Sequence, residues 1–179
     1  MKVIFGPRPH ENPLCRVVLI EPQIPENTGN IARTCVGTHS ELHLVKPMAF
    51  EITESRVKRA GCDYWPDLAW IGHDSYADWK REVESANESA TDGQLSRVFY
   101  IETSGTKSLY EVEFRRGDWL VFGKETTGLT EEQMRGHDAV NNSEVLYIPM
   151  PGNVRSFNLS NAAAIAVFEV FRQTSGQKP

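Results

Sequence analysis

The last helix that the sequence predicts, residues 159–173, has almost no polar side. Between Ala162 and Phe171 the only charged residue is Glu169. A helix that is apolar on all sides must be buried on all sides. In a chain of only 179 residues we expect part of that cover to come from a second subunit. This helix is therefore the strongest constraint on how the chain folds and assembles.

A loop rich in Pro, Gly, Asn and Ser leads into this helix. It offers backbone groups and small polar side chains at a helix N-terminus, where a polar ligand can be held. Five polar residues lie within seven positions: Arg155, Ser156, Asn158, Ser160 and Asn161. A helix start needs one cap residue, and Ser and Asn are favoured there. Elaborate capping and ligand binding are both consistent with this pattern.

The overall composition excludes several classes of protein. No apolar run approaches the roughly 20 residues that span a bilayer, and the apolar stretch near the N-terminus is too short for a signal peptide. We therefore expect a cytoplasmic protein that does not insert into a membrane. Cys15, Cys35 and Cys62 are widely spaced, without a CxxC pair, which predicts reduced thiols and no metal site.

The charge of the chain argues against a general nucleic-acid coat. The formal net charge is -5, whereas phosphate binding relies on clustered Lys and Arg. One local basic cluster consists of Arg56, Lys58 and Arg59. A local basic patch therefore remains compatible with the sequence.

Short apolar runs alternate with helical patterns, which predicts an α/β fold with a mostly parallel sheet flanked by helices. The predicted strands are 16–21, 41–45, 98–102, 119–123 and 145–149. The predicted helices are 28–37, 56–60, 76–85, a short one from Thr130, and 159–173. Residues 1–15 are expected to be a loose extension and residues 84–94 a surface loop. Without a repeat or a linker, the chain is predicted to form a single domain.

The segment EPQIPENTGNIARTC, residues 21–35, is the first that could carry chemistry. Asn27, Asn30 and Arg33 are three residues apart, so they share one side of the predicted helix. One interpretation is a well-capped helix with a surface arginine. The other is a polar rim at the carboxyl end of a strand, where α/β proteins bind their ligands.

The segment LVFGKETTGL, residues 120–129, is the second. It resembles a phosphate-binding loop but lacks the GxxxxGK[ST] spacing, because Glu125 stands where the hydroxyl should be. No GxGxxG fingerprint occurs in the chain either. Glu125 follows a predicted strand closely and could accept hydrogen bonds from a bound ligand, although an ordinary turn would give the same pattern.

Together these segments resemble the three motifs of the SPOUT class of RNA methyltransferases, and most of all the minimal TrmL (YibK-like) family. The resemblance rests on IPENTGNIARTC at 24–35, FGKETTGL at 122–129 and IPMPGNVRSFNLSNAAAIAVFE at 148–169, with ELHLVKPMAF at 41–50 and KRAGCDYW at 58–65 in support. It covers about residues 16–173. The motifs are specific as a set, whereas any one alone would be weak.

The resemblance implies a SPOUT domain over 16–173, between an N-terminal extension at 1–15 and a tail at 174–179. It implies a deep C-terminal trefoil knot over about 98–173, which binds S-adenosylmethionine without a metal. It also implies a homodimer with the final helix in its interface. Pattern reasoning alone would not propose a knot, since knots are nearly absent from proteins.

Roles for single residues follow from the resemblance as well. The cofactor-binding residues that it implies are Ile101, Thr103, Gly123, Glu125, Ile148, Met150, Ser156, Asn158 and Leu159. The catalytic residues that it implies are Asn27, Arg33, Ser156 and Asn158. Asn27 and Arg33 are expected to face the cofactor of the other subunit. Because a guanidinium is a poor base, we expect Arg33 to orient the ribose hydroxyl or to bind a phosphate.

The activity that the resemblance implies is that of a tRNA (cytidine(34)-2'-O)-methyltransferase, which methylates the ribose of the wobble nucleotide in the anticodon loop. One alternative is another SPOUT ribose methyltransferase of tRNA or rRNA, although many of those enzymes carry large RNA-binding extensions. The other is a knotted RNA-binding protein without activity. The retained Asn27, Arg33, Glu125, Ser156 and Asn158 favour an enzyme.

Overall fold

The computed structural model describes residues 3–5, 10–52, 63–88, 95–135 and 143–175. The predicted helix at 56–60 lies outside these ranges, as do the basic cluster of Arg56, Lys58 and Arg59 and the thiol of Cys62. The account that follows concerns the described residues.

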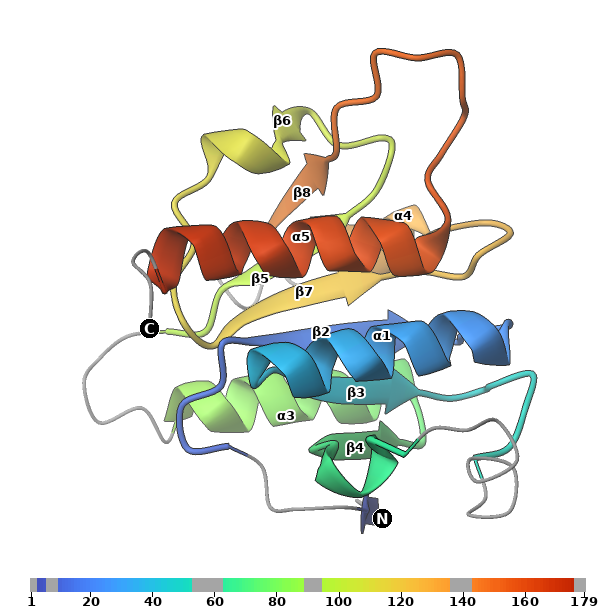
Figure 1. Ribbon diagram of the computed structural model, residues 1–179, viewed down its shortest axis with the longest axis vertical. Helices are drawn as coiled ribbons and strands as arrows, with labels where there is room; N and C mark the ends of the chain where they lie inside the picture. The colour runs from blue at the N-terminus through green and yellow to red at the C-terminus, as the bar shows by residue number, and fades with distance from the viewer. Residues whose placement is uncertain (1–2, 6–9, 53–62, 89–94, 136–142, 176–179) are drawn as a thin grey trace.

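An eight-stranded sheet forms the centre of the molecule (Figure 1). In spatial order its strands are β1 (Val3–Phe5), β4 (Trp70–His73), β3 (Glu41–Val45), β2 (Cys15–Ile20), β7 (Asp118–Phe122), β5 (Val98–Ile101), β8 (Ser143–Tyr147) and β6 (Lys107–Ser108). All neighbours pair in parallel except β1, which runs antiparallel to β4. The predicted α/β class with a mostly parallel sheet is therefore confirmed.

Helices cover both faces of the sheet. Helices α1 (Pro25–Thr38) and α5 (Leu159–Thr174) lie side by side on one face, and α3 (Tyr76–Glu88) lies on the other (Figure 1). Three short helical segments complete the fold: η1 (Trp65–Asp67), η2 (Leu109–Glu111) and α4 (Glu131–Arg135). Central strands covered on both faces are expected to be apolar, as VFYI is and as CRVVLI is apart from Arg16.

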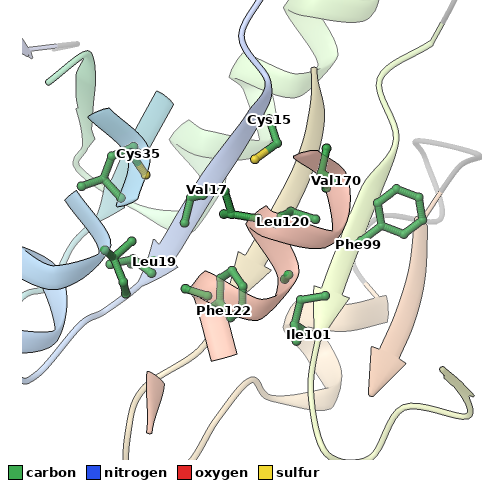
Figure 2. Close-up of a cluster of buried hydrophobic side chains, with 14 of the residues drawn as sticks. Cys15, Val17, Leu19, Cys35, Phe99, Ile101, Leu120, Phe122 and Val170 are labelled. Atoms are coloured by element: carbon green, nitrogen blue, oxygen red, sulfur yellow. The ribbon is translucent and has the colours of Figure 1, made fainter. Parts of the chain in front are cut away.

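The side chains of β2 alternate between two hydrophobic clusters, as a pleated strand requires. Val17 and Leu19 point toward α1 and α5, while Val18 and Ile20 pack in the cluster of the α3 face. Figure 2 shows the first cluster, with Cys15 and Cys35 inside it. Both cysteines are free and buried, and burial raises the pKa of the Cys15 thiol to about 12. The predicted reduced thiols are confirmed for these two residues.

Several predicted boundaries are wrong. Helix α1 begins at Pro25, where a proline is well suited to the first helical turn, rather than at residue 28. Helix α3 continues to Glu88 through the start of the predicted loop at 84–94, since its buried Trp79 and Val83 anchor it to the sheet. The four-residue β4 was not predicted. The extension expected to be loose contains β1, which pairs with β4.

Helix α5 is not buried on all sides within one chain. Ala163, Ala166 and Val170 are fully buried, whereas the side chains of Phe168 and Phe171 are 54% and 42% exposed. Its one central charge, Glu169, is buried and accepts hydrogen bonds from Arg172 and Gln173. The apolar sequence of the helix therefore leaves an aromatic surface uncovered by this chain.

Candidate functional site

A pocket of about 320 Å³ lies beyond the carboxyl ends of β5, β7 and β8, beside the first turn of α5. Ligand sites in proteins span roughly 300–1,000 Å³, and open α/β sheets place them at this edge. It is lined by Ile101, Glu102, Thr103, Phe122, Gly123, Lys124, Glu125, Thr126, Thr127, Gly128, Ile148, Met150, Arg155, Ser156, Phe157, Leu159 and Ala162. Three loops that are far apart in the sequence thus meet around one cavity.

The pocket gathers all of the predicted cofactor-binding residues except Asn158. Ile101, Ile148, Met150 and Leu159 form an apolar part of its wall. Neither Asn27 nor Arg33 lines it. The predicted catalytic residues are therefore divided, with Ser156 in the wall and the others outside it.

The carboxylate of Glu125 ties the loop after β7 to the start of α1. One oxygen accepts hydrogen bonds from the Ile24 backbone N–H (3.1 Å) and the Asn27 side-chain amide (3.1 Å). The other accepts from the Gln23 backbone N–H (2.8 Å). Because α1 has no side-chain cap of its own, Glu125 serves as its anion at the N-terminus. Its oxygens are thus engaged by three protein donors, and because Glu125 also lines the pocket, its contact with a ligand stays a prediction.

Asn27 and Asn158 join the starts of the two helices. The Asn158 side-chain amide donates to Asn27 Oδ1 (3.0 Å), and Asn158 Oδ1 accepts from the Ser160 backbone N–H (2.9 Å). Asn158 is thus the N-cap of α5, so capping explains this part of the polar loop. Through Asn27 it is also linked to Glu125 and to the pocket loop. These three residues form a network behind the pocket wall.

Glu102 is a pocket residue that the sequence reasoning missed. Its carboxylate accepts from the backbone N–H groups of Thr103 (2.8 Å) and Leu129 (2.9 Å), so it fastens the loop after β5 to the loop after β7. Gly128 has a φ of +67° and faces Glu102 so closely that an added Cβ would overlap the carboxylate. An acidic residue at the end of a predicted strand was the available signal, but it was assigned to the strand itself.

Lys124 and Thr126 bind the chain rather than reaching into the pocket as free groups. Lys124 Nζ pairs with Glu21 at 2.6 Å, and the Thr126 hydroxyl donates to the Gln23 side chain at 2.7 Å. This agrees with the sequence, in which the loop lacks a phosphate-loop spacing. The segment after β7 is therefore held to the segment before α1 along most of its length.

Arg33 lies two turns beyond Asn27 along α1, with its side chain exposed. Its guanidinium stacks over the ring of Tyr64, with 4.6 Å from the guanidinium carbon to the ring centroid. Within the described ranges no hydrogen bond or ion pair engages it. Among the described residues, the ring of Tyr64 is thus the interaction that orders this side chain.

In the described part of the chain, no three His, Cys, Asp or Glu side chains are grouped so that they could hold a metal ion. No helix among those residues is long and apolar enough to cross a bilayer.

The SpoU rRNA methylase family matches residues 15–168 of this chain. The chain belongs to this family. A tRNA (cytidine(34)-2'-O)-methyltransferase of Saccharophagus degradans is 43% identical over 159 residues, which cover 88% of this chain and 94% of that protein. A protein of the same name from an Acidovorax strain is 39% identical over 163 residues, covering 91% and 94%.

This SpoU methylase is also similar to solved structures. One, from work on the 2-OH methylation of C/U34 on tRNA, is 39% identical with a TM-score of 0.76, covering 91% of this chain and 97% of that one. The SpoU methyltransferase AviRb from Streptomyces viridochromogenes, in complex with AdoMet, has a TM-score of 0.75 at 23% identity over 92% of this chain and 59% of its own. That second likeness supports the fold alone. The predicted SPOUT, TrmL-like membership is confirmed.

Proposed function

We propose that this SpoU methylase is a tRNA (cytidine(34)-2'-O)-methyltransferase, which methylates the ribose 2'-hydroxyl of the wobble nucleotide, C or U, in the anticodon loop. The observation that carries the proposal is similarity along nearly the whole length of both chains to proteins of that name. The pocket supports it, because two of the three motif segments, 122–129 and 148–169, line it together with the loop after β5.

The residues of the pocket suit S-adenosylmethionine. Ile101, Ile148, Met150 and Leu159 offer an apolar surface to the adenine, and the loops after β5, β7 and β8 bring backbone polar groups to the same cavity. When bound, the cofactor would supply a methyl group on a positively charged sulfur. The ribose oxygen would bond to the methyl carbon, and the sulfur would leave as part of S-adenosylhomocysteine. Ser156 stands in the wall as a hydroxyl donor for the polar end of the cofactor, whereas the Thr103 hydroxyl donates to Glu102 at 3.2 Å.

The chain's own contribution is mainly alignment, which can account for several kcal/mol of the barrier. Glu125, Asn27 and Asn158 hold the pocket loop and the starts of α1 and α5 in fixed relation. Arg33 then orients the ribose or binds a neighbouring phosphate. Guanidinium groups stay protonated in proteins and donate well to phosphate, so binding is favoured over proton abstraction.

The active form in this proposal is a cytoplasmic homodimer. The support is the exposed aromatic surface of α5, where Phe168 and Phe171 lie 6.0 Å apart between ring centroids. A second copy of the chain would cover this surface and would bring the exposed Arg33 toward the partner's cofactor. Such a shared site would explain why Arg33 does not line the pocket of its own chain, whereas the buried Asn27 bonds to Glu125 and Asn158 within its own chain.

A trefoil knot over about residues 98–173 belongs to the same proposal. The chain passes itself closely in this region. Added Cβ atoms at Gly105 and Gly123 would overlap the backbone of residues 146–147 and 128–129, respectively. Only glycine allows backbones to approach so closely. A knot would fix the pocket loops without a metal or a disulfide.

The test is to map 2'-O-methyl groups in total tRNA from cells with and without the gene, and to repeat the reaction with purified protein. We expect the methyl group at position 34 of some tRNAs to disappear with the gene and to return with the wild-type protein. Arg33→Ala should lower the rate at least a hundredfold, with the affinity for S-adenosylmethionine within about twofold.

Two results would contradict the proposal, and a third would decide the role of Arg33. An unchanged position 34 with a loss elsewhere in tRNA or rRNA would indicate another ribose methyltransferase. A lack of S-adenosylmethionine binding in calorimetry would indicate a non-catalytic RNA-binding protein. An Arg33→Ala protein with normal catalysis and weakened tRNA binding would assign Arg33 to binding alone.

A further inference from the structure

Tyr64 and Arg33 are 31 positions apart in the sequence and stack on each other in the fold. Tyr64 lies directly before η1, and Arg33 lies on α1. The guanidinium carbon is 4.6 Å from the centroid of the tyrosine ring, well within the roughly 6 Å over which a cation is attracted to an aromatic face. The two segments therefore meet at this pair.

The tyrosine is fixed at both ends. Its hydroxyl donates to the Gly29 carbonyl oxygen at 2.8 Å, and its own carbonyl oxygen accepts from the Asp67 backbone N–H at 3.0 Å. The side chain also packs against the hydrophobic cluster beneath α1. Gly29 lies one helical turn before Arg33, so the ring covers one ridge of α1. Such a ring is a rigid platform.

Arg33, in contrast, is exposed and is held only by this ring within the described parts of the chain. The contact is a cation–π interaction with the ring face and not a hydrogen bond to a carboxylate, so it leaves guanidinium N–H groups available to donate. A carboxylate partner would occupy those donors, whereas an aromatic partner orders the side chain and leaves them available. This arrangement suits an arginine that receives a phosphate or a ribose oxygen.

We propose that Tyr64 is a positioning residue, which holds the guanidinium of Arg33 in the orientation that meets the RNA. The inference rests on the proposed function, because it assumes that Arg33 acts on tRNA. It adds a residue outside the pocket wall to the machinery of the reaction. It also assigns the segment around η1 a role in the arrangement of α1.

A double-mutant cycle tests it, with Arg33→Ala, Tyr64→Leu and the double variant. In the wild-type background Tyr64→Leu should lower kcat/KM for tRNA about three- to thirtyfold, the range expected for a cation–π contact. In the Arg33→Ala background it should change kcat/KM less than twofold. Tyr64→Phe keeps the ring face and should remain within about threefold of wild type.

The controls separate positioning from folding. Affinity for S-adenosylmethionine and thermal unfolding are measured for each variant, and Tyr110→Leu, at an exposed tyrosine outside the pocket, serves as the matched substitution. An equal loss from Tyr64→Leu in both backgrounds, or no loss in either, would overturn the inference. If the wild type fails to methylate position 34, the proposed function fails instead. The same cycle measured on tRNA binding affinity then decides the role of Tyr64.

Discussion

Two carboxylates, Glu41 and Glu125, lie at opposite ends of the strands of the same sheet and have contrasting surroundings. Glu41 is the first residue of β3, and its side chain is fully enclosed. Glu125 lies in a loop beyond the carboxyl end of β7 and is half-buried. Each collects hydrogen bonds from segments distant in the sequence. The difference lies in what the hydrogen bonds hold.

Glu41 sits in a network made of strands. It accepts from Arg16 Nε at 3.1 Å and lies 3.6 Å from His43, which contacts His73 at 2.9 Å. Arg16 also donates to the Gly117 carbonyl oxygen and stacks over Trp119. Burial alone would raise the pKa of Glu41, but the nearby His43 and the charge of Arg16 lower it overall. None of these residues lines the pocket described above, so we expect the network to contribute to stability.

The Glu125 network is made of loops and helix starts, and it stands against the pocket. The same kind of interaction here fixes segments that strand pairing does not fix. The comparison shows that a buried carboxylate within strands supports the fold, whereas one between loops shapes a site. Substitutions at the two positions should therefore separate stability from ligand binding.

The largest effect on stability is expected for Glu41→Ala. It leaves Arg16 and His43 without their carboxylate, and breaking a buried ion pair on one side typically lowers the unfolding free energy by about 3 kcal/mol. Chemical denaturation measures this, and calorimetry should find the affinity for S-adenosylmethionine within twofold of wild type. Glu144→Ala, in an exposed pair with Lys107, is the control and should have little effect. A larger loss of cofactor affinity than of stability would contradict the comparison.

Glu125→Ala should affect cofactor binding more than Glu41→Ala does, and stability less. Three donors around the start of α1 lose their acceptor, which should lower the unfolding free energy by about 2 kcal/mol. The affinity for S-adenosylmethionine should fall at least tenfold, because the loop that bears Gly123 and Gly128 is no longer held. Calorimetry on protein shown to be folded is the measurement. Glu131→Ala, in the exposed pair with Arg135, is the control. Unchanged cofactor affinity would show that the network does not shape the pocket.

Most of the fold could be predicted from the sequence, because strands that are buried on both faces give strong apolar runs. The apolar run 98–101, for example, lies in a predicted strand and forms β5. The sequence prediction failed where the signal is weak or depends on tertiary contacts. Strand β4, WIGH, contains a Gly and a His in place of such a run, and β1 pairs along the edge that β4 offers.

The sequence predicted which residues line the pocket, but not how they contact the rest of the chain. Motif positions such as Ile148 and Met150 do line the pocket. The engagement of Glu125 with α1, about 100 positions earlier in the chain, depends on how two loops meet in space. The pairing of Arg33 with Tyr64 likewise follows from tertiary contacts. Residue types at intervals along the sequence do not carry that information.

The smallest expected effect is a pH dependence that separates the two networks. Burial lowers the pKa of His43, a shift that Glu41 and the more distant Glu82 oppose and Arg16 reinforces. The unfolded chain therefore takes up a proton near pH 6.5 that the folded chain resists, so stability is full above this pH and falls as pH drops below it. One proton gives at most about 1.4 kcal/mol for each pH unit.

Denaturation between pH 7 and 5.5 measures this slope, and His43→Gln should flatten it. The window lies above the range in which carboxylates ordinarily titrate, and the pKa of Glu41 is lowered further, so Glu41 should contribute little to it. The residues that line the pocket include no histidine. Cofactor affinity of the folded protein should accordingly change less across this window than stability does. A slope that persists in His43→Gln would assign the titration to another group and would remove His43 from the comparison.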